Sequence, residues 1–394
     1  MDFSFSEIMP AIAGFMGQAG DAYGWRNLVM IAVGGILIFL AIKKQYEPTL
    51  LLPIGFGAIL VNIPFSAVLT QIDPEGNVVI GALNVFFNAG IATEVFPLLI
   101  FIAIGAMIDF SPLFQRPMLL VFGAAAQFGI FMTMILATLC GFNLKEAAAI
   151  GIIGAADGPT SIIVATQFAK NLLGPISVAA YSYMALVPII QPPVIRMLTS
   201  KKERLMRMNF DANKKVSRTT LILFPIIVTI LAGIIAPSSL ALLGFLMFGN
   251  LIRECGVLGG LSKTAQNELA NIVTILLGIT IASTMTGDMF VKTSTLMILG
   301  LGIIAFVFDT AGGVLIAKLI NRFTRPEKRI NPMIGACGIS AFPMSARVIH
   351  TMGMKEDSHN YLLMPALSAN VGGQIGSVIV GGLILMLVPL FTAM

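Results

Sequence analysis

The chain has 394 residues, of which 57% are hydrophobic and only 11% are charged, and its mean hydropathy is +0.93. Roughly a quarter of the residues in a soluble protein are charged, so this composition excludes a soluble fold and predicts an all-α polytopic membrane protein within the lipid bilayer. The formal net charge of +5 comes from basic residues concentrated in two short connections. Such clusters are typical of topology signals and do not indicate a nucleic-acid partner.

Apolar segments with lengths near the ~20 residues that cross the hydrocarbon core follow one another along the chain. They lie near 27–42, 48–64, 93–110, 117–140, 173–198, 219–236, 240–253, 266–286 and 295–320. Further apolar segments at 144–170, 331–352 and 361–392 are interrupted by Gly, Pro or polar residues. We therefore predict a single integral membrane unit over 1–394, with roughly 9–11 transmembrane helices that include broken helices or re-entrant hairpins.

Basic loops indicate the orientation and divide the chain. The loop at 199–218 holds seven Lys or Arg against two acidic residues, and 322–329 is also basic, so both are expected on the cytoplasmic side. An N-terminal half at 27–198 precedes the first loop, and a C-terminal half at 219–394 follows it. The broken helices are expected at 144–170 in the first half and at 331–352 and 361–392 in the second.

Counting the crossings predicts a hairpin at 144–170. Lys43 and Lys44 indicate another cytoplasmic end. With these residues inside, the chain reaches Cys140 on the outer side and must return inward through 173–198. This order is possible only if 144–170 enters the membrane and leaves it on the same side, as two half-helices.

The first interrupted segment carries a carboxylate beside two helix breakers. Residues 151–166 read GIIGAADGPTSIIVAT, with Asp157 followed by Gly158 and Pro159. An ionised Asp at the bilayer centre costs ~3 kcal/mol on insertion scales, and an interrupted helix frees backbone carbonyls there. Carboxylate and carbonyl oxygens suit a hard cation, and transporters place coupling-ion sites at broken helices. A second interpretation, compatible with the first, is that Asp157 caps the second half-helix.

A similar pattern recurs near the C-terminus. Residues 367–382 read LSANVGGQIGSVIVGG, and Ala369-Asn370-Val371 aligns with Ala156-Asp157-Gly158. Corresponding broken helices in two halves of a chain predict inverted repeats with a site near the midplane. Asn370 is then expected to offer an amide oxygen opposite Asp157. The alternative is that these glycines form a face for close helix packing.

The third segment, NPMIGACGISAFPMSARVIH at 331–350, is punctuated by polar residues and bent by prolines. An Arg in such a segment is costly unless it meets an anion. Arg347 is therefore expected to pair with a carboxylate or to hold an anionic substrate through its planar fork. Alternatively, it reaches the interface from a helix end.

Two phenol groups, Tyr181 and Tyr183, lie within the apolar segment 173–198. Either hydroxyl is a candidate for the site near Asp157. Aromatic packing or a place in an interfacial belt explains them equally well.

These segments together resemble the β subunit of the biotin-dependent, sodium-pumping decarboxylases, which act on oxaloacetate, methylmalonyl-CoA or glutaconyl-CoA. The motifs are GAADGPTSI, NPMIGACGISAFPMSARV and SANVGGQIGSVI, and the resemblance covers most of the chain. It implies a carboxybiotin decarboxylase that couples loss of the carboxyl group to sodium export across the bacterial inner membrane, with proton uptake. It also implies three partners, namely a carboxyltransferase subunit, a biotin carrier protein and a small membrane γ or δ subunit. The small-residue faces also permit a homo-oligomer.

The resemblance assigns roles position by position. Sodium binding falls on Asp157 and Asn370, and Arg347 falls at the carboxybiotin site. The membrane tyrosine of the family matches Tyr183, which with Asp157 and Arg347 is expected to act in catalysis. Residues expected along the ion path are Asn331, Gly335 and Ser340.

A function from another class fits the same pattern. Broken helices with an Asp–Asn pair also suit a secondary sodium-coupled organic-anion transporter or a sodium/proton antiporter, without any chemistry. Sodium-dependent loss of the carboxyl group from carboxylated biotin, blocked by avidin, distinguishes the decarboxylase from these transporters.

Overall fold

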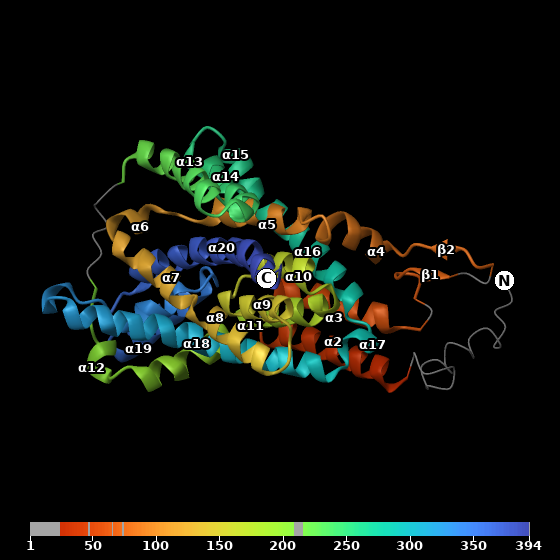
Figure 1. Cartoon of the computed structure of the whole chain (residues 1–394). Coiled ribbons are helices and arrows are strands. Elements are labelled where there is room, and N and C mark those ends of the chain that lie inside the picture. Colours follow the sequence, from red (N-terminus) through yellow and green to blue (C-terminus); the bar gives the residue numbers. More distant parts are fainter. Residues whose placement is uncertain (1–23, 46–47, 65, 73–74, 209–215, 394) are drawn as a thin grey trace.

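The computed structural model describes residues 24–45, 48–64, 66–72, 75–208 and 216–393. Almost every element in these ranges is helical (Figure 1). The exception is a small antiparallel pair, β1 (Gln71–Ile72) and β2 (Val78–Val79), in which Gln71 lies opposite Val79. The predicted all-α membrane fold is confirmed.

The N-terminal half of the chain contains most of the helices that surround the first interruption. They are α2 (Trp25–Lys43), α3 (Pro48–Asn62), α4 (Ala82–Phe86), α5 (Val95–Met107), α6 (Ser111–Gln115), α7 (Val121–Ala126), α8 (Phe128–Leu139), α9 (Leu144–Gly151), α10 (Gly158–Phe168) and α11 (Leu173–Leu198).

The C-terminal half follows a short helix, α12 (Lys201–Arg204), in the basic loop, whose residues 209–215 lie outside the described ranges. The helices of this half are α13 (Arg218–Ile235), α14 (Leu240–Glu254), α15 (Gly259–Thr264), α16 (Ala270–Ile281), α17 (Gly287–Phe290), α18 (Thr293–Phe323), α19 (Met344–Glu356) and α20 (Leu363–Ala393). A 3₁₀ segment, Pro332–Gly338, precedes α19.

Six helices in the described ranges are long and apolar enough to cross a membrane, and the number rises to eight if each of two bent pairs counts as one span. The bend of 67° in α11 separates Lys170–Met184 from Leu186–Leu198. Pro188 explains it, because proline has no amide hydrogen to donate to the carbonyl of Met184. The predicted 9–11 crossings also include shorter helices such as α3 and α14, and this larger number stays a prediction.

The two halves repeat the same order of elements and pack in matched pairs. Helix α2 packs on α3 in the first half, and α13 packs on α14 in the second. Across the halves, α5 contacts α14, and its counterpart α16 contacts α3. Likewise α9 contacts α8 as the 3₁₀ segment contacts α18, and α11 contacts α18 as α20 contacts α7. Such reciprocal pairing is the pattern of two interlocked repeats, and it supports the predicted inverted repeats.

The first interrupted segment is a hairpin. Its arms are α9 and α10, and its ends meet where Asn171 Nδ2 donates a hydrogen bond of 3.2 Å to Glu146 Oε1. Asn143 and Glu146 form a capping box that begins α9. Because both ends lie together, the chain enters and leaves on one side, as predicted. Arms of this length reach only about halfway through a membrane.

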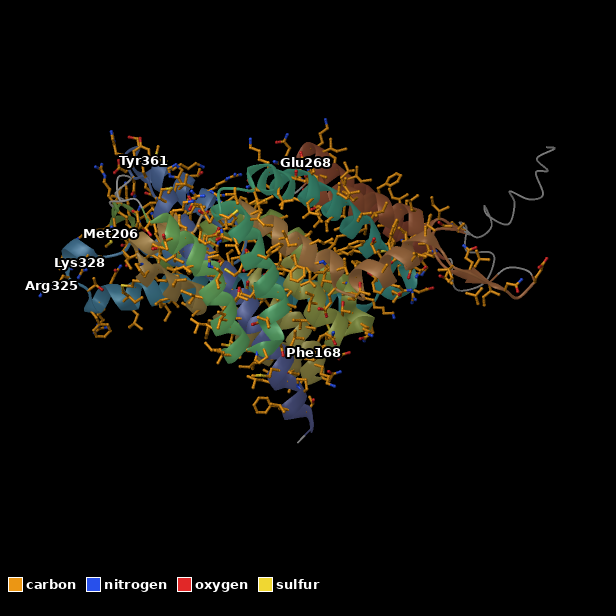
Figure 2. All side chains as sticks on the ribbon, turned by 90° about the horizontal axis from the view of Figure 1, so that it is seen from above. Phe168, Met206, Glu268, Arg325, Lys328 and Tyr361 are labelled. Atoms are coloured by element: carbon orange, nitrogen blue, oxygen red, sulfur yellow. The ribbon has the colours of Figure 1, made fainter. Side chains whose placement is uncertain are left out.

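The interrupted segment predicted at 331–352 is also a hairpin, here called the second hairpin, which spans 331–356. Its two ends meet at one backbone group, because Asn331 Nδ2 and Asn360 Nδ2 each lie 3.0 Å from the carbonyl oxygen of Arg204. Arg204 belongs to the basic loop, so this hairpin opens on the predicted cytoplasmic side. Figure 2 shows Met206, Arg325, Lys328 and Tyr361 together at one end of the molecule and Phe168 away from it.

The hairpins approach each other from opposite sides and touch at their tips. Helix α11 leads from the open end of the first hairpin to the basic loop at the open end of the second. At the tips, Ser340 N donates a hydrogen bond of 3.0 Å to Ala155 O. The repeat partner of 144–170 is therefore 331–356, rather than the segment around Asn370.

The predicted interruption at 361–392 is wrong, because α20 runs from Leu363 to Ala393 without a break. Glycine keeps its amide hydrogen and therefore allows a helix to continue, unlike proline. The glycines permit close packing instead. A Cβ at Gly373 would lie 2.4 Å from Gly338 O, and a Cβ at Gly123 would lie 2.1 Å from Gly372 O. The packing alternative holds for this segment.

A methyl group at Gly373 is expected to disturb the meeting of α20 with the second hairpin. Gly373→Ala should destabilise the protein by roughly 1–3 kcal/mol, as overpacking does, and lower the temperature of unfolding in detergent. Gly300→Ala is the matched control, because a Cβ at Gly300 meets no atom within 4 Å. Equal unfolding temperatures for the two variants would contradict this packing.

Ion pairs fasten the basic loop to the second hairpin. Arg204 Nε lies 2.7 Å from Glu356 Oε1, and Arg207 Nη2 lies 2.7 Å from Asp357 Oδ2. The hydrogen bond from Arg207 lowers the pKa of the Asp357 carboxyl below its usual value. A lowered pKa means that the pair stabilises the fold above the pKa of the unfolded state, and that this stabilisation is lost as the pH falls through the pKa of the folded state.

We therefore expect Arg207→Gln to lower the unfolding temperature slightly at pH 7, and this difference to disappear below the folded-state pKa of Asp357. Thermal unfolding at both pH values measures it. Arg322→Gln serves as the control, because Arg322 is exposed and forms no ion pair within the described ranges. A drop of the same size in acid would mean that the ion pair is not its cause.

Candidate functional site

Asp157 lies at the tip of the first hairpin because the backbone turns sharply just before it. Ala156 adopts a left-handed conformation (φ 53°, ψ 41°) that ends the 3₁₀ turn Ile152–Ala155. Asp157 then becomes the N-cap of α10, with Pro159 in the first turn. The predicted capping role is confirmed, and the side chain is only 3% exposed.

The carboxylate of Asp157 has neutral partners. Thr160 Oγ1 donates a hydrogen bond of 2.8 Å and Ser377 Oγ one of 3.1 Å, both to Oδ2, while Thr160 N lies 3.4 Å from Oδ1. Among the described residues, no basic side chain forms an ion pair with it. An ionised carboxylate in this position lacks a counter-charge, and a bound cation would supply one.

The tip of the second hairpin completes the cluster. Ser340 Oγ is hydrogen-bonded to Ser377 Oγ and lies 3.1 Å from Gly373 O. Asn370 Nδ2 donates a hydrogen bond of 2.6 Å to Ile339 O, while the buried Asn370 Oδ1 has no hydrogen-bond partner. The cluster therefore combines carboxylate, hydroxyl, carbonyl and amide oxygens, the donor set that hard cations prefer. The free amide oxygen is an acceptor that a cation would satisfy.

Asn370 is not the direct partner of Asp157. That position on α20 belongs to Ser377, two turns further along the helix and roughly 10 Å along its axis. Asn370 instead contacts the second hairpin, and Ser340 and Ser377 connect it to Asp157. Sequence reasoning gave Ser377 no role. The similarity of Ser161-Ile162-Ile163-Val164 to Ser377-Val378-Ile379-Val380 was the available signal.

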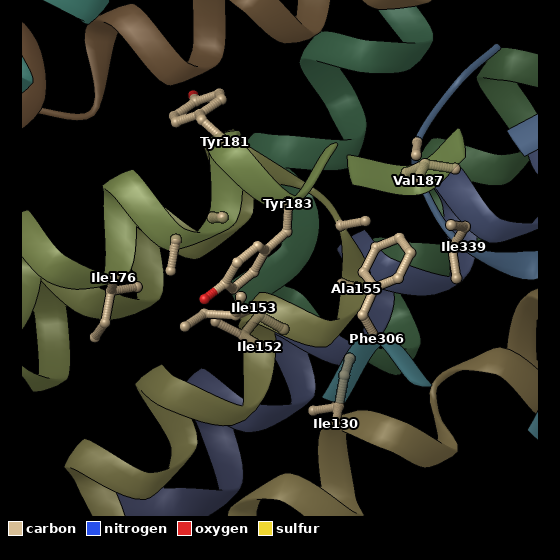
Figure 3. Close-up of a cluster of buried hydrophobic side chains, with 14 of the residues drawn as sticks. Ile130, Ile152, Ile153, Ala155, Ile176, Tyr181, Tyr183, Val187, Phe306 and Ile339 are labelled. Atoms are coloured by element: carbon tan, nitrogen blue, oxygen red, sulfur yellow. The ribbon is translucent and has the colours of Figure 1, made fainter. Parts of the chain in front are cut away.

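The two tyrosines of α11 point in different directions (Figure 3). Tyr183 points toward Ile153 and donates its hydroxyl hydrogen to Leu299 O. Tyr181 packs on the tip of the first hairpin, where a Cβ at Gly158 would lie 2.1 Å from Tyr181 Cε1. The Tyr181 hydroxyl is buried without a hydrogen-bond partner. The structure therefore places Tyr181, rather than Tyr183, beside Asp157.

Two predicted ion-path residues lie outside this cluster. Asn331 is at the open end of the second hairpin, where Nδ2 donates to Arg204 O and Met206 O and Oδ1 accepts from Met333 N. Gly335 packs against α18, because a Cβ there would lie 2.0 Å from Gly313 O. Both residues hold the second hairpin in place, and their predicted role on the ion path stays a prediction.

Arg347 lies on an exposed stripe of α19 with Thr351 and Lys355, spaced four residues apart. Within the described ranges it forms no ion pair. It is nine residues before the end of α19 at Glu356, which corresponds to roughly 13 Å of helix. A guanidinium at that depth requires water or an anion. The stripe is therefore suited to line a polar space that opens toward the basic loop.

Comparison with known proteins identifies relatives over most of the chain. The family described as Na+-transporting oxaloacetate decarboxylase beta subunit matches residues 26–388. The chain is 46% identical to the methylmalonyl-CoA decarboxylase subunit beta of Propionigenium modestum, over 96% of this chain and 100% of that protein. It is 47% identical to the glutaconyl-CoA decarboxylase subunit beta of Acidaminococcus fermentans, over 93% and 94%. Identity to the oxaloacetate decarboxylase beta chain of Klebsiella pneumoniae is 44%, over 92% and 95%.

Removing the charge at the hairpin tip is expected to weaken cation binding. Asp157→Asn should weaken sodium binding roughly a thousandfold, because a unit charge at 4 Å contributes about 4 kcal/mol at an effective dielectric constant of about 20. Calorimetric titration of the purified protein with sodium chloride measures this change. Asp288→Asn, at a side chain 51% exposed, is the control and should bind as the unchanged protein does. Undiminished binding by Asp157→Asn would remove this carboxylate from the site.

Proposed function

The chain belongs to the family of Na+-transporting oxaloacetate decarboxylase beta subunits, and from this membership we propose that it decarboxylates carboxybiotin and uses the free energy to move sodium ions out of the cell. The coarse role, a decarboxylase subunit that translocates sodium, follows from the family. The proposal adds the substrate, the bacterial inner membrane as the location, and the residues that act.

One observation supports the transport part of the proposal above all others. Two hairpins open on opposite sides and meet tip to tip at a buried carboxylate without a counter-charge. Displacement of one hairpin at a time would open the cluster to one side and then to the other, which is alternating access around a fixed site. Asp157 and Asn370 Oδ1 would hold the sodium ion, and Ser340 and Ser377 are placed to join them.

The position of Arg347 supports the chemical part. A biotin carrier protein would approach from the cytoplasmic side, where the stripe on α19 begins at Lys355. The guanidinium of Arg347 can hold a carboxylate through two parallel hydrogen bonds. Decarboxylation breaks the bond between the ureido nitrogen and the carboxyl carbon, releases CO₂, and leaves a nitrogen that takes up one proton. A site that excludes water favours this step, because it destabilises the charged carboxylate.

The proton requires a carrier near the site. Asp157 is one candidate, because its carboxyl group can hold either a proton or a sodium ion. Tyr181 packs beside it with an unpartnered hydroxyl, so it is better placed than Tyr183 to pass a proton. Arrival of sodium at Asp157 would release the proton that the ureido nitrogen consumes, and this exchange links transport to chemistry.

The acyl substrate is expected to be handled by another polypeptide. Relatives named for methylmalonyl-CoA, glutaconyl-CoA and oxaloacetate are all 44–47% identical to this chain. This similarity fits a subunit that processes only the biotin-bound carboxyl group. We therefore propose that a carboxyltransferase subunit, a biotin carrier protein and a small membrane γ or δ subunit complete the complex.

Sodium uptake into inverted vesicles tests the function. With the complete complex, carboxylated biotin should drive sodium inward, and avidin should abolish the uptake. Each ion moved against ~100 mV costs ~2.3 kcal/mol, so uptake should fall as the opposing potential rises. Sodium movement that needs no carboxylated biotin would instead identify a secondary transporter.

Replacing Arg347 separates chemistry from ion binding. Arg347→Gln should reduce decarboxylation at least tenfold, because a hydrogen bond to a charged group contributes roughly 1.5–3 kcal/mol, while calorimetric sodium binding stays unchanged. Lys355→Gln, on the same exposed stripe, is the matched control. Loss of sodium binding in Arg347→Gln, or full decarboxylation, would contradict the assigned role.

A further inference from the structure

A second buried carboxylate lies in the membrane region outside the cluster described above. Asp309 is in the middle of α18, a helix long and apolar enough to span a membrane, and its side chain is fully buried. Both of its carboxyl oxygens lack a hydrogen-bond partner. Neither the transport cluster nor the carboxybiotin site uses this residue.

The surrounding backbone leaves space for this carboxyl group. A Cβ at Gly129 would lie 2.3 Å from Asp309 Oδ1, and a Cβ at Gly154 would lie 2.5 Å from Oδ2. Gly129 is in the first turn of α8, and Gly154 is in the 3₁₀ turn of the first hairpin. Any side chain at either position would displace the carboxyl group. Asp309 therefore fills a space bounded by glycine backbone. One of these glycines, Gly154, lies three residues before Asp157 in the chain.

No described group neutralises a negative charge on Asp309. Among the described residues it forms no ion pair. The amides of Gly129 and Ile130 face it from the start of α8 but lack full hydrogen-bond geometry. Several elements packed against α18 carry titratable side chains, and none of these side chains is hydrogen-bonded to Asp309. They are Tyr181, Tyr183 and Arg196 on α11, Lys145 and Glu146 on α9, and Cys337 on the 3₁₀ segment.

An ionised carboxylate in this place would be costly, because burial of an unpaired charge costs several kcal/mol even after relaxation. A proton removes that cost without requiring further ligands. A sodium ion would need several free oxygen atoms around it, whereas the contacts found here are the glycine backbone and the first-turn amides of α8. The surroundings favour a proton.

We propose that Asp309 is a proton-binding site, neutral in the arrangement described here and deprotonated when the first hairpin moves away and water reaches the carboxyl group. The second clause rests on the proposed function, because it assumes that the hairpin moves during sodium transport. The reaction is the simple exchange of one proton between the carboxyl group and water. Gly154, which packs against Asp309, belongs to the same hairpin as Asp157. Movement of this hairpin therefore links sodium binding at Asp157 to proton release at Asp309.

Infrared spectroscopy of the purified complex tests whether the proton is present. At pH 7 the exposed carboxyl groups are ionised, so a carbonyl-stretching band of a protonated carboxylic acid reports buried acids. In Asp157→Asn, which lacks the other buried acid of the hairpin region, this band should be present, and it should be lost in the double variant Asp157→Asn/Asp309→Asn. The measurement requires no decarboxylation, so it stands even if the proposed function fails.

Matched variants separate a proton site from a structural one. Asp309→Asn should unfold at nearly the same temperature as the unchanged protein, because the amide has the shape and neutrality of the protonated acid. Gly154→Ala should shift the band, whereas Gly35→Ala, where a Cβ meets no atom within 4 Å, should not. Absence of the band in Asp157→Asn, or its persistence in the double variant Asp157→Asn/Asp309→Asn, overturns the proposal. So does severe destabilisation of Asp309→Asn, which would indicate an ionised carboxylate held by the start of α8.

Sodium titration followed by the same band tests the link between the sites. Sodium should diminish the band more in the unchanged protein than in Asp309→Asn, where only Asp157 can release a proton, and should leave it unaltered in Asp157→Asn. An equal decrease in the unchanged protein and in Asp309→Asn overturns the release of the proton from Asp309.

Discussion

The fold depends on the cost of an uncompensated carboxylate among apolar helices. Asp157 is buried at the tip of a hairpin, and only neutral donors contact its carboxylate. Water or counter-ions would solvate such a group at a protein surface, whereas a bilayer supplies neither. The group therefore needs a ligand, either a proton or a cation. This requirement makes the site suitable for transport, because neither ligand is permanently built in.

Interrupted helices create a second cost, which the structure offsets locally. Each hairpin tip leaves backbone groups without helical partners, and the tips satisfy some of these groups for each other, as Ser340 N does for Ala155 O. Asn370 donates to Ile339 O, and Ser340 Oγ meets Gly373 O. The same atoms that would bind an ion therefore also connect the hairpins to α20. Displacement of a hairpin would change these hydrogen bonds, so ion binding and movement are energetically coupled.

Glycines determine how closely the elements approach. Helix α20 crosses α7 and the second hairpin at glycines on both sides of each contact, and α18 meets Gly129 and Gly154 at Asp309. These contacts bring backbone carbonyls and carboxyl groups within reach of one another. Asp157 at the tip of the first hairpin and Asp309 on α18 consequently border neighbouring parts of that hairpin, since Gly154 packs against Asp309, and the proposed exchange between sodium and protons rests on this arrangement.

Much of this architecture was predictable from local patterns. Apolar length predicted the membrane helices, the basic loops predicted that 199–218 and 322–329 lie at one end of the molecule (Figure 2), and the count of crossings predicted the hairpin at 144–170, because each depends on transfer free energies of nearby residues. Asp-Gly-Pro-Thr predicted a helix start at Asp157 for the same local reason. The glycines near Asn370 were ambiguous, since glycine permits both a break and close packing, and only the neighbouring Gly338 carbonyl decides between them.

The sequence by itself determined the membrane environment, the broken helix and the charged residues that require partners. Tertiary structure alone decided which residues meet. It placed Ser377 rather than Asn370 against Asp157, brought Tyr181 rather than Tyr183 to the hairpin tip, paired 144–170 with 331–356, and enclosed Asp309 between two glycines. The physical reason is that burial cost is a property of each residue, whereas the identity of its partners depends on helix rotation and crossing, which are set by packing between distant segments.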